Sequence, residues 1–172
     1  DYQRYRAEGY NRIPLTREVH ADLDTPVSTY LKLARGPYSY LLESVVGGEK
    51  WGRYSIIGLP CSTIIRVVRN ELAIEQNGEE IHSQQTEDPL RAIQTIRQQF
   101  NVPQIEGLPR FTGGLVGYFG YGTTQYIERH IATAEKRDPT ATPDILLMVS
   151  DEVVVFDNLG GRLHVVVHTD PE

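Results

Sequence analysis

The chain has 172 residues, which is about the length of one domain and enough to bury a sizeable core. Hydrophobic residues make up 40% and charged residues 23%, proportions that exclude the disordered and fibrous classes. The 17 basic residues are scattered among 23 acidic ones, for a formal net charge of -6, so nucleic acid and anionic membranes are not expected partners.

Apolar runs are no longer than a β-strand, as in 145–149, so we expect no membrane-spanning helix. No signal-like apolar stretch follows Asp1, and the single cysteine, Cys61, has no partner for an internal disulfide. Both observations favour a chain trimmed from a protein of the cytoplasm, which is a reducing compartment.

The first elements are expected to be a strand, a short helix and a second strand. Residues 11–19 alternate apolar and polar side chains, as a strand does. Because threonine caps a helix and proline suits its first turn, a helix is expected to begin at Thr25-Pro26 and to end at Gly36-Pro37. Residues 38–46 are rich in apolar side chains and predict the second strand.

An antiparallel meander is predicted next, because β-branched and aliphatic residues recur in short segments separated by turns. Its strands are expected at 54–59, 63–69, 72–76 and 80–83, with a hairpin turn at Asn77-Gly78. Asp88-Pro89 then begins a helix with one apolar stripe, which should lie across a sheet face.

The last third predicts a second meander. A connector at 101–109 leads to a glycine-rich strand at 110–121, a short helix at 123–130 and a loop at 137–143. Strands at 145–149, 153–156 and 162–168 are expected to form that meander. The sequence therefore predicts an α+β fold of mostly antiparallel sheets (meanders) packed with a few helices, over one compact unit.

One segment has the composition of a ligand site. Glu43 and Ser44 lie side by side at the end of the apolar strand, and the basic residues of 47–55 follow them. An amino acid ligand needs an anion, a cation and apolar walls, which this segment can supply. A solvated strand end beside a surface loop is the alternative reading of the same residues.

The glycine-rich segment 113–122 invites comparison with phosphate-binding loops, but it has neither the P-loop ending nor the G-x-G-x-x-G spacing. Close packing of a crowded strand explains its glycines better. The histidines lack partners at metal-ligand spacing, Cys61 is expected to be an inert buried thiol, and the charges at Asp151-Glu152 are expected to belong to a surface turn. We therefore expect no catalytic residue, no metal site and no cofactor in this chain.

Several motifs, taken in order, resemble the amino-terminal domain of the anthranilate synthase component I family. They are Tyr10 to Leu15, Thr25 to Leu33, Leu41 to Ser44, Gly52 to Gly58, Gly113 to Tyr121, and Pro143-Asp144 leading into Ser150-Asp151. Each motif is modest alone, but their ordered combination is specific and spans nearly the whole chain, 1–172.

The resemblance implies a regulatory domain. In the family, a carboxyl-terminal domain that is absent here binds chorismate and magnesium, and a glutamine amidotransferase subunit delivers ammonia. The amino-terminal domain binds L-tryptophan as a feedback inhibitor, so the expected partners are L-tryptophan, the catalytic domain of the same protein and the amidotransferase subunit. This chain alone is not expected to be active.

The family's tryptophan site includes the Leu-Leu-Glu-Ser strand and basic residues in the loop after it. The resemblance therefore carries the site over to Leu42, Glu43, Ser44, Lys50 and Arg53. One departure is Gly122, where the family usually has Asp. Two alternatives stay open, namely the equivalent domain of the related aminodeoxychorismate synthase and a scaffold that docks the amidotransferase subunit without sensing tryptophan.

Overall fold

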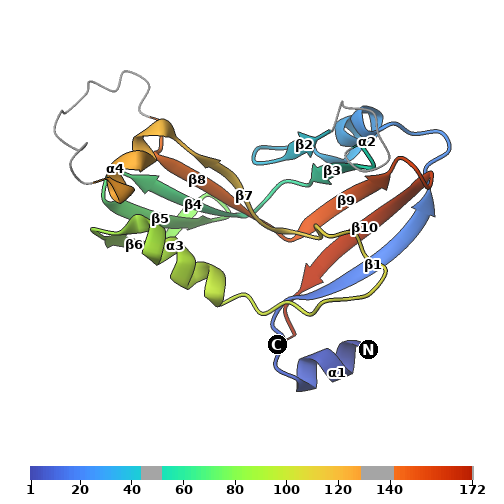
Figure 1. The fold of residues 1–172 in the computed structure, drawn as a ribbon, viewed down its shortest axis with the longest axis horizontal. Coiled ribbons are helices and arrows are strands. Elements are labelled where there is room, and N and C mark those ends of the chain that lie inside the picture. Colours follow the sequence, from blue (N-terminus) through green and yellow to red (C-terminus); the bar gives the residue numbers. More distant parts are fainter. Residues whose placement is uncertain (44–51, 129–141, 172) are drawn as a thin grey trace. The chain divides into compact units, whose positions relative to one another are not determined.

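The computed structural model describes residues 1–43, 52–128 and 142–171 (Figure 1). Contacts divide the chain into two compact units. Unit 1 comprises Asp1–Cys61, Phe100–Gly114 and Ser150–Glu172, and unit 2 comprises Ser62–Gln99 and Leu115–Val149. The length alone favoured one compact unit, whereas the strands sort into two sheets that each bury a core of their own.

Unit 1 contains a five-stranded antiparallel sheet in the order β1-β10-β9-β3-β2. The strands are β1 (Ile13–His20), β2 (Tyr40–Leu42), β3 (Tyr54–Gly58), β9 (Glu152–Asp157) and β10 (Arg162–Thr169). Strand β9 is central and is buried on both faces, as its continuous apolar run predicts. Val154 and Phe156 join Ile57 in one cluster, and Val153 and Val155 join Val166 in the other.

Helix α2 (Pro26–Leu33) covers the first of these clusters, through Tyr30 and the following Ala34. Thr25 and Ser28 form a reciprocal capping box at its start, with Pro26 at the first helical position, so the predicted helix start is confirmed. The second cluster is covered by Phe111, which lies in the connector before β7 (Gly114–Phe119). Helix α1 (Tyr2–Ala7), which the sequence reading missed, is a six-residue element with no buried residue.

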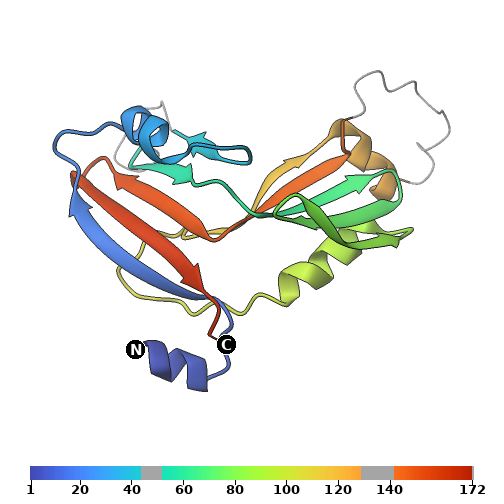
Figure 2. The ribbon, with the colours of Figure 1, turned by 180° about the vertical axis from the view of Figure 1, so that it is seen from behind.

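Unit 2 contains the second five-stranded sheet, in the order β6-β5-β4-β8-β7. Its strands are β4 (Thr63–Val68), β5 (Glu71–Gln76), β6 (Glu79–Gln85), β7 (Gly114–Phe119) and β8 (Ile145–Ser150). Helix α3 (Pro89–Gln98) lies along this sheet, as Figure 2 shows from behind, and buries Ile93. Asp88 caps it by accepting a hydrogen bond from the Arg91 amide, 3.0 Å away, so this predicted helix is also confirmed. A 3-10 turn, η1 (Tyr121–Thr123), and helix α4 (Thr124–Ile127) follow β7.

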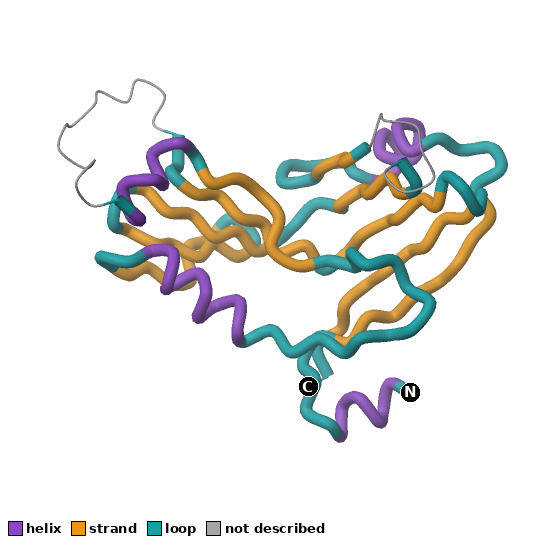
Figure 3. The backbone as a smooth tube through the Cα atoms, viewed as in Figure 1, coloured by secondary structure: helices purple, strands orange, loops and turns teal. Residues whose placement is uncertain are grey.

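The predicted α+β fold class is confirmed, because the described residues form two sheets and several helices (Figure 3). The strand pairings in both sheets are antiparallel. The assignment of strands to meanders was partly wrong. Strand β3 pairs with β9 and β2 and not with β4, and β8 pairs with β4 and not with β9. Short connections at 59–62 and at 151 carry the chain from one sheet to the other, and local sequence does not distinguish them from hairpin turns.

Two strands are shorter than predicted. The strand expected at 38–46 is observed as β2 only, and the part of that prediction from residue 44 on lies outside the described residues. The strand expected at 110–121 begins only at Gly114, because Gly113 and Gly114 have φ angles of 143° and 130°, and Phe111 packs on the unit 1 sheet. In the described part of the chain, no helix is long and apolar enough to cross a membrane.

Candidate functional site

The Leu-Leu-Glu-Ser segment lies at the edge of the unit 1 sheet. Leu41 and Leu42 of β2 pair with Ile57 and Ile56 of β3. The Leu41 side chain packs against the core cluster that helix α2 covers, whereas the Leu42 side chain is 51% exposed. Glu43 follows the last strand residue and is exposed. This edge therefore offers a carboxylate beside an accessible apolar side chain.

Arg53 lies immediately before β3 and is held by Asp157 at the end of β9. Its Nε donates to Asp157 Oδ1 over 3.0 Å and its Nη2 donates to Oδ2 over 2.6 Å. The guanidinium carbon is also 4.9 Å from the centroid of the Tyr54 ring. Both the bidentate bond and the ring contact require the flat guanidinium group of arginine. The ammonium group of a lysine would not reproduce either contact.

The turn after β9 fixes the segment that carries Arg53. Asn158 donates its backbone N–H to the Arg53 carbonyl over 2.7 Å, and its side-chain amide donates to the Gly52 carbonyl and to Ser55 Oγ. Asp157 Oδ1 accepts further hydrogen bonds from the amides of Leu159 and Gly160. Residues 52–55 are thus tied to a turn more than a hundred residues away in sequence, which no local pattern could reveal.

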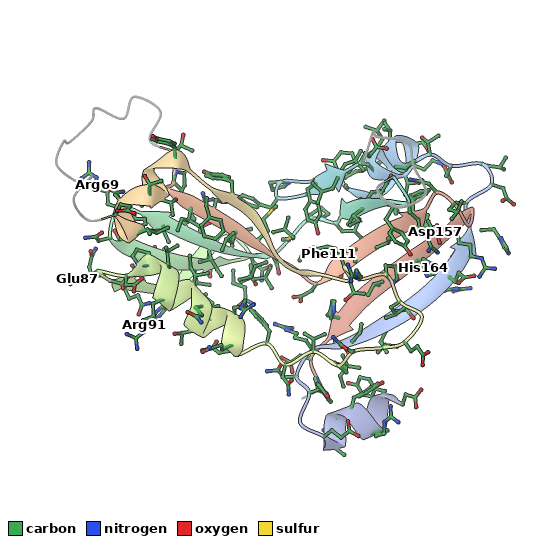
Figure 4. All side chains as sticks on the ribbon, in the orientation of Figure 1. Arg69, Glu87, Arg91, Phe111, Asp157 and His164 are labelled. Atoms are coloured by element: carbon green, nitrogen blue, oxygen red, sulfur yellow. The ribbon has the colours of Figure 1, made fainter. Side chains whose placement is uncertain are left out.

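A polar pocket of about 300 Å³ opens beside Arg53, entirely within unit 1. Figure 4 labels two of its lining residues, Asp157 on β9 and His164 on β10. Arg162 on its wall donates to Glu18 over 2.8 Å, and the His164 ring nitrogen is 4.0 Å from the other oxygen of Glu18. The charges that line the pocket are therefore largely paired with one another.

The structure brings part of the predicted effector site together. Leu42 pairs with Ile56, and Ile56 lies three residues after Arg53 in the chain. The end of β2 and the beginning of β3 therefore lie together at one edge of the unit 1 sheet. Ser44 and Lys50, the other two predicted residues, lie outside the described residues. Sequence reasoning missed Asp157, which positions Arg53 and is not marked by any motif.

The ion pair limits what Arg53 can do. The bond to Asp157 uses two of the five N–H groups of a guanidinium. A ligand carboxylate must therefore use the remaining N–H groups or displace Asp157. Hydrogen bonds from Arg53 are the main reason why the pKa of the Asp157 carboxyl is lowered, and the turn amides of Leu159 and Gly160 lower it further. Asp157 is therefore an anion at neutral pH.

The Asp157 contacts predict an acid-sensitive fold. Because the folded protein lowers the pKa of Asp157, the pair stabilises the fold above the ordinary aspartate pKa of about 4, and this stabilisation is lost as the pH falls below that value. Thermal unfolding midpoints from pH 7 to pH 3 should therefore fall more steeply for the wild-type protein than for Asp157→Asn. Parallel curves for the two proteins would contradict this assignment.

Other candidate chemistry is weak in the described part of the chain. It contains no group of three or more His, Cys, Asp or Glu residues placed to hold a metal ion. Cys61 is half-buried, and burial raises the pKa of its thiol, which opposes thiolate formation. Gly117 packs so tightly on the Leu146 carbonyl that a side chain would not fit there. Close packing, and not phosphate binding, therefore explains why this position is a glycine.

The expectation that Asp151 and Glu152 are surface charges was right for Glu152, which is exposed, and wrong for Asp151. Asp151 is not a simple surface charge, since it is half-buried in the connection between β8 and β9. Burial raises the pKa of its carboxyl, while Arg12, whose Nη1 is 3.9 Å from Asp151 Oδ2, opposes that rise. The Asp151 carbonyl also accepts a hydrogen bond from the His168 amide over 2.8 Å.

Comparison with curated proteins identifies relatives along almost the whole chain. Anthranilate synthase component 1 of Pseudomonas aeruginosa is 56% identical over 99% of this chain, and that of Neisseria meningitidis serogroup B is 54% identical over 99%. The protein of the same name from Aquifex aeolicus is 43% identical over 94%. This chain is a homologue of anthranilate synthase component 1. The resemblance of its ordered motifs is thereby confirmed.

The match covers the amino-terminal part of these anthranilate synthase components. The chain spans about a third of their length, 35% for the Pseudomonas aeruginosa protein. Among solved structures, anthranilate synthase component I from Streptococcus pneumoniae matches 90% of this chain and 31% of its own, with 26% identity and a TM-score of 0.50. No model in a collection of protein families matches the chain.

Proposed function

We propose that this chain is the amino-terminal, feedback-sensing domain of the large subunit of an anthranilate synthase. This enzyme is a lyase that forms anthranilate from chorismate and glutamine in the first step of tryptophan biosynthesis. The observation that carries the proposal is the 56% identity over 99% of the chain to a protein of that name. Identity at this level over a whole domain supports a shared role as well as a shared fold.

The proposal assigns the chemistry to the rest of the protein. Chorismate and magnesium bind to the catalytic domain, which corresponds to the part of the relatives that this chain does not match. The glutamine amidotransferase subunit supplies ammonia, and the assembly works in the cytoplasm. This domain contributes regulation, so it needs a ligand site but no nucleophile or metal of its own.

The effector of that regulation is L-tryptophan, bound at the edge where β2 ends and β3 begins. Its ammonium group is matched by the exposed Glu43 carboxylate, and its indole ring by the exposed side of Leu42. Arg53, already oriented by Asp157, supplies the N–H groups that a carboxylate requires. Ser44 and Lys50 complete the proposed set.

Inhibition follows from differential affinity. L-tryptophan shifts the protein toward its inactive arrangement only by as much as it binds that arrangement more tightly. Coupling of this kind between two sites is typically about 1–3 kcal/mol. The proposed regulation is therefore modest in energy and sensitive to single side chains at the effector site.

The Glu43→Gln substitution tests the site. It keeps the size of the side chain but removes the charge that pairs with the ligand ammonium, so the Kd for L-tryptophan in the full-length protein should rise about ten-fold or more. Isothermal titration calorimetry measures that Kd, with L-phenylalanine as the specificity control. Loss of inhibition of anthranilate formation should accompany the loss of affinity.

A matched variant separates the site from a general effect of charge. Glu79→Gln removes an exposed carboxylate of β6 in unit 2 and should leave the Kd unchanged. If Glu43→Gln and Ser44→Ala both bind L-tryptophan as the wild-type protein does, the site is elsewhere. If L-tryptophan does not bind the full-length wild-type protein while the amidotransferase subunit still does, the domain is a scaffold.

A further inference from the structure

Tyr40 links the edge strand β2 to a distant part of unit 1. Its hydroxyl lies 2.8 Å from Ser150 Oγ, although the two residues are 110 positions apart in sequence. Its ring covers Gly58, the residue with which it pairs on β3, so closely that a side chain at Gly58 would overlap it. Tyr40 is therefore held at both ends of its side chain.

Ser150 is fully buried at the last position of β8, so its hydroxyl depends on a partner within the protein. Burial is the main cause that raises the pKa of the Tyr40 hydroxyl, which keeps it protonated and able to hydrogen-bond. Because separation would cost the buried Ser150 hydroxyl its hydrogen bond with the Tyr40 hydroxyl, the two side chains are expected to move together.

The connection that begins at Ser150 is tied to the end of β10. The His168 amide donates to the Asp151 carbonyl over 2.8 Å, and His168 Nδ1 is 3.3 Å from the same oxygen. Gly113 packs against the Ser150 carbonyl, where a Cβ atom would come within 2.5 Å. Ser150 is thus packed closely against Gly113, and the residue that follows it is hydrogen-bonded to the end of β10.

We propose that Tyr40 is a positioning residue for feedback inhibition, whose hydrogen bond with Ser150 transmits occupancy at the end of β2 to the 150–151 connection and the end of β10. This inference rests on the proposed function, since it concerns the regulation of the same effector site. Leu42 and Glu43 lie two and three residues beyond Tyr40, and β2 has only three residues, all paired with β3. The proposed ligand contacts therefore lie within three residues of the Tyr40–Ser150 hydrogen bond.

Contiguous packing alone does not establish coupling, so the coupling itself has to be measured. The variants are Tyr40→Phe, which retains the ring over Gly58, and Ser150→Ala, each in the full-length protein. The quantity to follow is the factor by which saturating L-tryptophan lowers kcat/KM for chorismate. We expect each variant to reduce that factor at least about five-fold, and the double variant to reduce it no further.

Two further readouts distinguish transmission from simple structural support. Without L-tryptophan, kcat and KM for chorismate should remain within about two-fold of wild type, and calorimetry should show that both single variants still bind L-tryptophan. Tyr118→Phe is the matched control, because it removes a tyrosine hydroxyl that donates to the Pro143 carbonyl in unit 2. It should leave inhibition unchanged.

The outcomes separate this inference from the proposed function. If L-tryptophan fails to bind the wild-type protein, the proposed function and the inference both fall. If L-tryptophan binds and inhibits both variants as strongly as wild type, the inference alone is overturned. Loss of L-tryptophan binding in Tyr40→Phe would also overturn it, because Tyr40 would then support the site and not transmit its occupancy.

Discussion

Replacing Gly117 with alanine is expected to destabilise the unit 2 sheet by about 3 kcal/mol, the upper range for overpacking a well-filled interior. Gly117 lies in β7, next to β8, and a Cβ atom there would overlap the carbonyl oxygen of Leu146. That oxygen belongs to the backbone of the neighbouring strand, so it cannot rotate away as a side chain can. For a chain of this length, the midpoint of thermal unfolding should fall by roughly 6–12 °C.

Gly120→Ala provides the matched control within the same glycine-rich segment. A Cβ atom at Gly120 would come 3.0 Å from the Asp144 carbonyl oxygen, a contact that a small shift relieves, so its effect should be clearly smaller. Hydrogen exchange should localise the Gly117→Ala effect to the amides of β7 and β8. Equal midpoints for Gly117→Ala and the wild-type protein would show that the two strands separate easily at this point.

Gly58→Ala is expected to destabilise unit 1 by about 2 kcal/mol, because the new methyl group overlaps the Tyr40 ring. The ring cannot move aside freely, since its hydroxyl is bonded to the buried Ser150. In a Tyr40→Ala background the same methyl group meets no ring, so its cost should almost vanish. Midpoints for the wild-type protein, both single variants and the double variant complete this double-mutant cycle.

A Tyr118→Ala background serves as the control for that cycle. Tyr118 belongs to unit 2, so the cost of Gly58→Ala there should equal its cost in the wild-type protein. Additive effects of Gly58→Ala and Tyr40→Ala would mean that the ring does not hold its observed position. The cycle therefore tests the geometry on which the proposed role of Tyr40 depends, without any ligand.

Several elements could be predicted because their causes are local. Thr25 and Asp88, each followed by a proline, begin helices α2 and α3 through hydrogen bonds to amides three residues on. Alternating or continuous apolar runs identified strands such as β4 and β9, whose side chains fill the cores. The six-residue helix α1 escaped prediction because it buries no side chain, and so its sequence carries no apolar stripe.

The candidate site was only partly predictable. The ordered motifs led to Leu42, Glu43 and Arg53, and relatives of the same family name confirm the resemblance. The partner of Arg53 did not emerge from the sequence, because Asp157 is 104 residues away and reaches it only through the β3–β9 pairing. An aspartate that begins a turn looks the same in sequence whether or not an arginine lies opposite.

Most of the strands, the capped helices, the α+β class and the family could be predicted, because they depend on neighbouring residues or on ordered motifs. Which sheet each strand joins became clear only from the three-dimensional fold, as in the separation of β3 from β4 and of β8 from β9. The same holds for the Tyr40–Ser150 and Arg53–Asp157 contacts. Strand pairing and buried hydrogen bonds are satisfied by whichever distant segment supplies a complementary surface, and the local sequence pattern does not encode that choice.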